Sequence, residues 1–186
     1  PTSGSDASNM LTHPEFHGDH NKINGTKNWV TNGFNCDYII LFAVTTQNIG
    51  HKGISAFLVE KNYTGLKVGK LEDKLGIRSS DTTELYFENV KVPLENRIGE
   101  EGDGFKIALA TLDGGRIGIA AQALGIAQAS LDNSISYAKE RIQFGKPIST
   151  KQAVQFKIAN MAMEIEAARL LTYKAAKMKD NKQKFS

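Results

Sequence analysis

The sequence predicts an α+β fold in which an antiparallel β sandwich or barrel is followed by the first two long helices of a bundle. Two observations support this prediction. The first half of the chain contains short strand-like runs separated by Gly and Asn turns. After "ENRIGEEGDG" the apolar residues recur with a period of about 3.6, which is typical of helices. We therefore expect two domains, a β domain at 1–98 and the start of a helical domain at 99–186.

Three stretches of the first half have the patterns of strands. "YIILFAVTT" at 38–46 is a continuous apolar run, which predicts a strand buried on both faces. "ISAFLVEK" at 54–61 predicts the next strand, after a loop at "NIGHKG". "TELYFENVKVP" alternates apolar and polar residues but slips by one position near Glu88-Asn89, which indicates a bulge or a turn.

The stretch "KNWVTNG" holds the only tryptophan of the chain, Trp29. The dipeptides Asn24-Gly25 and Asn32-Gly33 lie on either side of it and are typical of hairpin turns, because Asn and Gly tolerate positive φ angles. A lone indole between two turns is compatible with ordinary sheet packing and with one wall of a ligand site. The residues alone leave both interpretations open.

Two long helices are predicted in the second half. The first runs from Phe105 to near Arg141, "FGKP" interrupts the pattern, and "STKQAVQF" begins the second helix. Ser149 and Gln152 have the spacing of a capping box at this start. Helices of about 30 residues would be roughly 45 Å long. Because this is too long to cover a small sheet, we expect a bundle whose remaining helices lie outside this chain.

Glycines interrupt the first helix at 114, 115, 118 and 125, although each costs up to about 1 kcal/mol relative to Ala. For Gly118 and Gly125, close packing against another helix and a functional role are equally good explanations. In "DGGR" at 113–116, two adjacent glycines separate an acid from a base, so another molecule could approach the helix backbone there.

Composition and charge exclude several classes of function. Hydrophobic residues make up 40% and charged residues 23% of the chain, which is typical of soluble globular proteins. No apolar run approaches the roughly 18 residues of a membrane span. The net charge of +3 comes from interspersed Lys and Glu and does not indicate nucleic-acid binding. The single cysteine excludes an internal disulfide framework and suits a reducing compartment.

No metal site is expected from the three histidines near the start, His13, His17 and His20. Pro14 and Gly18 prevent a helix that could align them, and no Cys or carboxylate cluster supports them. An exposed hairpin loop is the better interpretation of this segment.

Five stretches follow one another along nearly the whole chain and together resemble the acyl-CoA dehydrogenases: "PTSGSD", "NGTKNWVTNG", "KLGIRSSDTTELYFENVKVP", "LDGGRIGIAAQALGIAQ" and "YAKERIQFGKPI". The second is similar to the family's Asn-Gly-x-Lys-x-Trp-Ile-Thr-Asn hairpin, with Val30 in place of Ile. "AARLLTYKAA" is most similar to the short-chain and short/branched-chain (butyryl-CoA) members. The resemblance implies an N-terminal helical domain, a middle β domain and a C-terminal four-helix bundle. This chain, expected to be a piece of a longer protein, lacks the first and half of the last.

The resemblance implies an FAD-dependent oxidoreductase that desaturates a short-chain acyl-CoA thioester to the trans-2-enoyl-CoA, in fatty-acid or branched amino-acid breakdown. In the family a glutamate removes the α proton, the β hydrogen leaves as hydride to N5 of FAD, and an electron-transfer flavoprotein takes the electrons. An acyl-CoA oxidase and a non-catalytic protein that retains the fold are the alternatives. The family also implies a homotetramer, a dimer of dimers, in the cytoplasm of a bacterium or the mitochondrial matrix of a eukaryote.

The resemblance also assigns residues to an FAD site. Trp29 would pack beside the isoalloxazine, and the Thr31 hydroxyl would hydrogen-bond near flavin N5. The residues implied to bind FAD are Gly4, Ser5, Trp29, Val30, Thr31, Arg141, Phe144 and Gln152. The last three would reach FAD bound to a neighbouring subunit, where a guanidinium suits a diphosphate and an aromatic ring suits adenine.

For the acyl-CoA substrate, the implied contacts are Ser5, Asp113, Gly114, Gly115 and Arg116. The catalytic glutamate is expected beyond Ser186. A minority of the family carries it one residue before the arginine of the first long helix, and this position is Gly115 here, which has no carboxylate. No catalytic base is therefore assigned within this chain.

Overall fold

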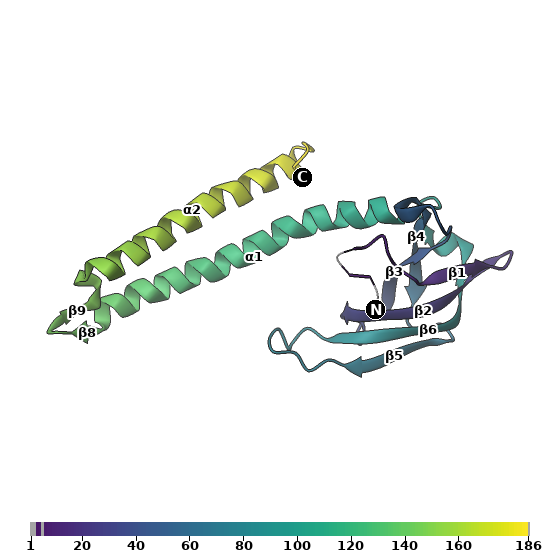
Figure 1. Cartoon of the computed structure of the whole chain (residues 1–186), viewed down its shortest axis with the longest axis horizontal. Helices are drawn as coiled ribbons and strands as arrows, with labels where there is room; N and C mark the ends of the chain where they lie inside the picture. Colours follow the sequence, from purple (N-terminus) through teal and green to yellow (C-terminus); the bar gives the residue numbers. More distant parts are fainter. Residues whose placement is uncertain (1–2, 5, 186) are drawn as a thin grey trace. The chain divides into compact units, whose positions relative to one another are not determined.

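The computed structural model describes every residue except 1, 2, 5 and 186. Contacts along the chain divide it into two compact units, Pro1–Leu109 and Ala110–Ser186. The first unit is built mainly from antiparallel strands, and the second consists mainly of two long helices (Figure 1). The predicted α+β fold class is confirmed.

The larger sheet of the first unit has the strand order β1-β2-β6-β5, and all its neighbouring strands are antiparallel. Its strands are β1 (His13–Phe16), β2 (His20–Thr31), β5 (Leu66–Leu71) and β6 (Thr82–Pro93). The second sheet, of order β3-β4-β7, contains β3 (Tyr38–Val44), β4 (Ile54–Glu60) and β7 (Arg97–Ile98). Two short 3-10 helices, η1 (Gly50–Gly53) and η2 (Leu94–Asn96), lie in the connections.

The core of the first unit is formed by the inward faces of both sheets. Successive side chains of a strand point to opposite faces, so every second residue enters the core. The most deeply buried members of this cluster are Ile23, Leu41, Ala43, Phe57, Val59, Leu85, Phe87, Val90 and Val92. Because burying one large apolar side chain contributes about 1.5–3 kcal/mol, this cluster holds the β2–β6 pair against the β3–β4 pair.

β3 is buried on one face only. Ile39 and Leu41 point to the core, whereas Tyr38 and Ile40 are 62% and 59% exposed. The prediction of a strand at 38–46 that is buried on both faces is therefore wrong in its burial, because only one side of this sheet packs against the larger sheet. The strand predicted to follow it is confirmed as β4.

The irregularity predicted near Glu88-Asn89 is confirmed as a β-bulge between β2 and β6. The register shifts between Ile23 and Gly25, and Asn89 has a φ of +55°. The Asn24 side-chain oxygen accepts a hydrogen bond of 2.8 Å from the Asn89 backbone N–H. The predicted hairpin turn at Asn24-Gly25 is wrong, because both residues lie within β2 and take part in this bulge.

Two other predicted turns are confirmed. Asn32-Gly33 begins a turn after β2, in which Asn32 has a φ of +60° and its carbonyl accepts the Asn35 N–H at 3.2 Å. The exposed hairpin loop predicted around the histidines connects β1 to β2, and the His17 N–H donates to the His20 carbonyl at 2.9 Å.

The second unit contains most of α1 (Gly104–Glu140) and all of α2 (Gln152–Asp180), which run antiparallel and side by side (Figure 1). Leu124 and Leu131 of α1 pack against Ile165 of α2, and the Arg169 guanidinium donates to Gln128 Oε1 at 2.6 Å. Large apolar side chains elsewhere on both helices are exposed, as in an incomplete bundle: Leu112, Ile119, Ile126, Met163, Leu170 and Leu171. None of the helices that the structure describes is long and apolar enough to span a membrane.

The break between the helices is a small hairpin, β8 (Ile142–Gln143) and β9 (Lys146–Pro147), followed by η3 (Ile148–Thr150). The capping box predicted at Ser149 and Gln152 is wrong. The N-cap of α2 is Lys151, and no side chain among the described residues caps this helix. Ser149 lies in η3, where its carbonyl accepts a bond of 2.9 Å from the Gln155 side chain. The extra 3-10 turn moves the start of the helix away from the position that the spacing indicated.

Candidate functional site

A cavity of about 820 Å³ opens beside β2 and β3 in the first unit. Its lining comes from the segment that precedes β1, from residues 24–30 of β2 and from residues 39–42 of β3. The lining includes Ser3, Gly4, Met10, His13, Lys27, Trp29, Val30, Ile40 and Leu85. A volume of this size is typical of sites for small molecules and cofactors, which are concave and mostly apolar.

Trp29 stands at a second bulge of β2. The register against β6 shifts between Lys27 and Val30, and Trp29 itself has a φ of +57°. A bulky residue in this left-handed region is a backbone outlier that costs on the order of 1–3 kcal/mol. The indole lines the cavity, yet 67% of its surface is exposed. A strained position that presents an exposed aromatic ring is typical of a ligand site rather than of sheet packing.

Asp81 holds the end of β2. Its Oδ2 accepts the backbone N–H groups of Phe34 at 2.7 Å and Asn35 at 3.3 Å. Its carbonyl accepts the Asn32 N–H at 2.9 Å. These bonds fix the chain directly after Thr31, which is exposed and lies beside the lining rather than in it. Nothing in the sequence pattern identified this aspartate, because an acid before a strand is common in turns.

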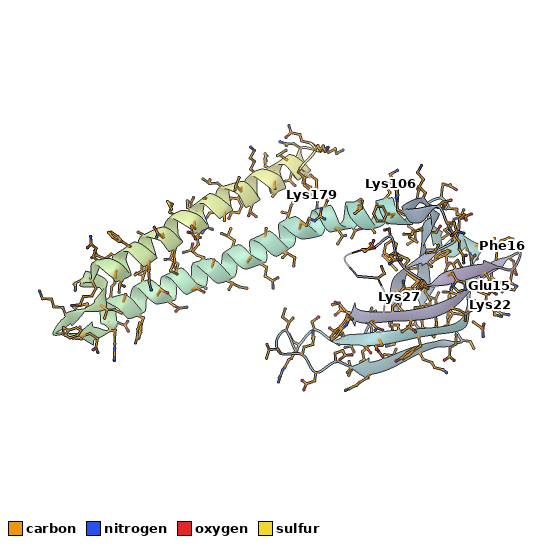
Figure 2. All side chains as sticks on the ribbon, viewed as in Figure 1. Glu15, Phe16, Lys22, Lys27, Lys106 and Lys179 are labelled. Atoms are coloured by element: carbon orange, nitrogen blue, oxygen red, sulfur yellow. The ribbon has the colours of Figure 1, made fainter. Side chains whose placement is uncertain are left out.

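Lys27 is the lysine of the cavity (Figure 2). It lies opposite Leu85 in the β2–β6 ladder, so its side chain shares a face of the sheet with that fully buried residue. No hydrogen bond or ion pair holds its ammonium group in the described part of the chain, and burial lowers the pKa of Lys27 to about 8. Asn28 also lines the cavity, and its Oδ1 is buried without a partner among the described residues. Sequence patterns missed both residues, since Lys and Asn are common on the polar face of a strand.

A second group of predicted residues lies on α1 in the second unit. Asp113 accepts a 2.7 Å ion-paired hydrogen bond from Arg116, one turn along the helix. A Cβ on Gly114 would come within 2.9 Å of Lys179 Nζ, so this lysine of α2 fills the space beside that glycine (Figure 2). Apart from the adjoining residues and the backbone of α1 itself, no described atom lies within 4 Å of a Cβ built on Gly115. The helix backbone is therefore accessible to another molecule at Gly115, whereas the Lys179 ammonium group covers it at Gly114.

Gly118 and Gly125 are also open, because no described atom lies within 4 Å of a Cβ built on either. Close packing against α2 therefore does not explain them. The faces that they uncover are available to a ligand or to further helices of the bundle.

The third group lies at the hairpin between the helices. Arg141 directly follows α1, and its carbonyl accepts the Ile148 N–H at 2.9 Å. Phe144 has a φ of +53° and is 92% exposed, and Lys151 Nζ lies 5.2 Å from the centre of its ring. Gln152 is the first residue of α2 and is exposed. The structure therefore brings Arg141, Phe144 and Gln152 to one corner of the second unit.

Gly4 of the N-terminal segment also lines the cavity, and no described atom beyond the adjoining residues lies within 4 Å of a Cβ built on it. Ser5, implied to contact both FAD and substrate, lies outside the described residues. Within the described ranges, no three metal-binding side chains gather into a cluster that could hold an ion.

Comparison with known protein families identifies both units. The acyl-CoA dehydrogenase middle-domain model matches residues 1–90, and the acyl-CoA dehydrogenase C-terminal-domain model matches residues 102–186. The chain belongs to the acyl-CoA dehydrogenase family. The resemblance deduced from its five stretches is confirmed.

Individual relatives agree with this assignment. The chain is 53% identical to the mitochondrial short-chain specific acyl-CoA dehydrogenase of Rattus norvegicus over 186 residues, all of this chain and 45% of the relative. The solved structure of butyryl-CoA dehydrogenase from Megasphaera elsdenii superposes with a TM-score of 0.95 at 52% identity, covering all of this chain and 49% of that one. A chain in a structure of the electron transferring flavoprotein of Acidaminococcus fermentans gives a TM-score of 0.93 at 51% identity, with the same coverage. The chain spans about half the length of the curated relatives it matches.

The strain at Trp29 can be measured by substitution. We expect Trp29→Gly to be at least as stable as the wild type, because glycine adopts a φ of +57° without strain. Trp29→Val should be about 1–2 kcal/mol less stable than Trp29→Gly, because a β-branched residue is poorly accommodated there. Urea unfolding measures both. At the exposed strand position Tyr38 the order should reverse, with Val more stable than Gly. If Trp29→Val were more stable than Trp29→Gly, the backbone at position 29 would not be strained.

Lys27 makes stability depend on pH in a defined direction. Its pKa is about 8 in the folded chain and 10.5 in the unfolded one, so the unfolded chain binds more protons between these values and stability rises there with pH. We expect Lys27→Met to be about 1–3 kcal/mol more stable than the wild type at pH 7 in the ligand-free protein. This difference should shrink as pH rises through 8 to 10.5. Urea unfolding at pH 7, 9 and 10.5 tests it, and a difference independent of pH would contradict it.

Proposed function

We propose that the chain is part of an FAD-dependent acyl-CoA dehydrogenase that desaturates short-chain acyl-CoA thioesters to trans-2-enoyl-CoA. The observation that carries the proposal is the strained, exposed Trp29 beside a largely apolar cavity, in a chain that belongs to this family. The short-chain preference is supported by the names of the relatives, which are short-chain specific and butyryl-CoA dehydrogenases.

The cavity has the features that an isoalloxazine ring requires. Trp29 offers an aromatic face and Ile40 extends the apolar wall, so that both exclude water from the reacting edge of the ring. Thr31, at the fixed end of β2, carries a hydroxyl that can hydrogen-bond to the ring. Gly4 leaves room for the backbone to approach a ligand. FAD, when bound, supplies the acceptor for the hydride that leaves the substrate.

For the substrate, we assign the polar pair Asp113–Arg116 and the open backbone at Gly115 to contacts with the CoA moiety. Because Gly114 has no side chain, the Lys179 side chain can approach the helix at this position. We assign no catalytic base to the residues of this chain. As the family resemblance implies, we propose that the glutamate that removes the α proton lies beyond Ser186 in the full-length protein.

The assembly and partners are proposed from the same comparisons. Arg141, Phe144 and Gln152 share an exposed corner, which suits contact with FAD bound to a neighbouring subunit in a dimer of dimers. An electron-transfer flavoprotein as electron acceptor is supported by the similarity to a chain in a structure of such a flavoprotein. The name of the mammalian relative supports a mitochondrial location in a eukaryote, and the family resemblance implies the matrix there and the cytoplasm in a bacterium.

The proposal is tested with the full-length protein and butyryl-CoA. We expect formation of the trans-2-enoyl thioester with electron-transfer flavoprotein as acceptor, and slow turnover with oxygen alone. Chromatography of the thioesters and optical reduction of the flavin measure the two steps. Fast turnover with oxygen alone would indicate an acyl-CoA oxidase, and flavin that butyryl-CoA never reduces would indicate a non-catalytic protein.

Arg141→Ala and Thr31→Ala should separate the two ends of the FAD site. Loss of a charge-assisted contact of about 1.5–3 kcal/mol in Arg141→Ala should weaken FAD retention about 10- to 150-fold in the oligomer. Thr31→Ala should instead slow flavin reduction by substrate with little change in FAD affinity or assembly. Lys139→Ala, in the last turn of α1, is the matched control. Unchanged FAD affinity in an oligomeric Arg141→Ala protein would contradict the shared site.

A further inference from the structure

We propose that Lys27 binds the diphosphate of the flavin nucleotide within its own chain, an inference that rests on the proposed FAD site. The charge of the cavity is the first reason. Among the described residues that line it are one lysine, Lys27, one histidine, His13, and no Asp or Glu. A cavity that contains a cation and no carboxylate attracts an anionic ligand and disfavours a cationic one.

The surroundings of Lys27 give the second reason. Leu85, Ile39 and Leu41 line the same cavity and are buried, and Leu85 is the partner of Lys27 in the β2–β6 ladder, so the lysine lies on an apolar side of the cavity. A partly buried charge without a partner is costly unless a counter-ion is supplied. Burial accordingly lowers the pKa of Lys27 to about 8, and an anion placed beside it would restore the charged form.

The order of side chains along β2 points to a flavin nucleotide rather than to a simple anion. Lys27, Asn28 and Trp29 are consecutive and all line the cavity. The bulge between Lys27 and Val30 interrupts the regular alternation of faces, and all three side chains contribute to one lining. Asn28, between Lys27 and Trp29, has a buried Oδ1 without a partner in the described part of the chain. An aromatic face, a free acceptor and a cation in this order match a flavin ring, the hydroxyls of its ribityl chain and its diphosphate.

The N-terminal segment of the lining can accommodate phosphate oxygens. Ser3 and Gly4 line the same cavity as Lys27, and no described atom beyond the adjoining residues lies within 4 Å of a Cβ built on Gly4. Small residues allow close approach of an anion to the backbone. We therefore place the diphosphate in the part of the cavity that Lys27 and this segment line.

The test uses the flavin-free, full-length protein and three probes: FAD, FMN and riboflavin, which carry the same ring with a diphosphate, a monophosphate and no phosphate. Binding is measured by quenching of flavin fluorescence. We expect Lys27→Met to raise the Kd for FAD at least about tenfold and to leave the Kd for riboflavin within about twofold of the wild type. Lys27→Arg should retain most of the FAD affinity. Lys22→Met, on the same strand but outside the cavity lining, should bind all three as the wild type does.

Other outcomes overturn the inference. Equal losses for FAD and riboflavin in Lys27→Met would mean that the lysine supports the ring or the fold, and unchanged FAD binding would mean that it has no contact with the ligand. Thermal unfolding accompanies each titration, and Lys27→Met is expected to remain folded because it removes a buried charge. If the wild type binds no flavin at all, the proposed function itself fails. If the wild type binds FAD and Lys27→Met does so equally well, the inference about Lys27 alone fails.

Discussion

The pairing of β2 with β6 is the constraint on which the rest of the first unit depends. In a regular ladder, β2 would place alternate side chains on one face throughout, and a slip by one residue would exchange its two faces. Two bulges interrupt the ladder, between Ile23 and Gly25 and between Lys27 and Val30. One strand can therefore bury Ile23 in the core at one end and line a cavity with Trp29 at the other.

The unfavourable features of the first unit are concentrated in three consecutive residues. Lys27 holds a partly buried charge, Asn28 a buried acceptor without a described partner, and Trp29 a left-handed backbone. The hydrophobic cluster of this unit is deeply buried. Strain and unpaired polar groups persist in folded proteins where the surrounding structure enforces them, and they gather at functional sites. Their position in the lining of one cavity therefore supports the proposed site on grounds that do not depend on any relative.

Much of the fold followed from local patterns, whereas the shape of the site did not. The change of hydrophobic period predicted both the β unit and the long helices, because amphipathic periodicity reflects burial directly. Tertiary contacts decided the failures: the uncovered face at Ile40 contradicted the burial inferred for 38–46, and the 3-10 turn at η3 displaced the cap predicted at Ser149. Asp81 binds backbone groups that are distant in sequence, and Lys27 is desolvated by its surroundings in the fold. A local sequence pattern contains neither kind of information.

The length of α1 bears on how the second unit could serve a cofactor. Arg141 follows Asp113 by 28 positions on one nearly continuous helix, which separates them by about 42 Å at 1.5 Å per residue. A ligand group bound at Asp113–Arg116 therefore cannot also contact the corner of Arg141, Phe144 and Gln152. That corner is exposed and carries the Phe144 ring in a left-handed turn, with Lys151 Nζ over the ring. Such a surface suits ligand binding, but a ligand held at the Asp113 end of the same helix cannot reach it. This separation is consistent with the proposal that the corner of Arg141, Phe144 and Gln152 acts on FAD bound to a neighbouring subunit, because one helix keeps it far from Asp113–Arg116.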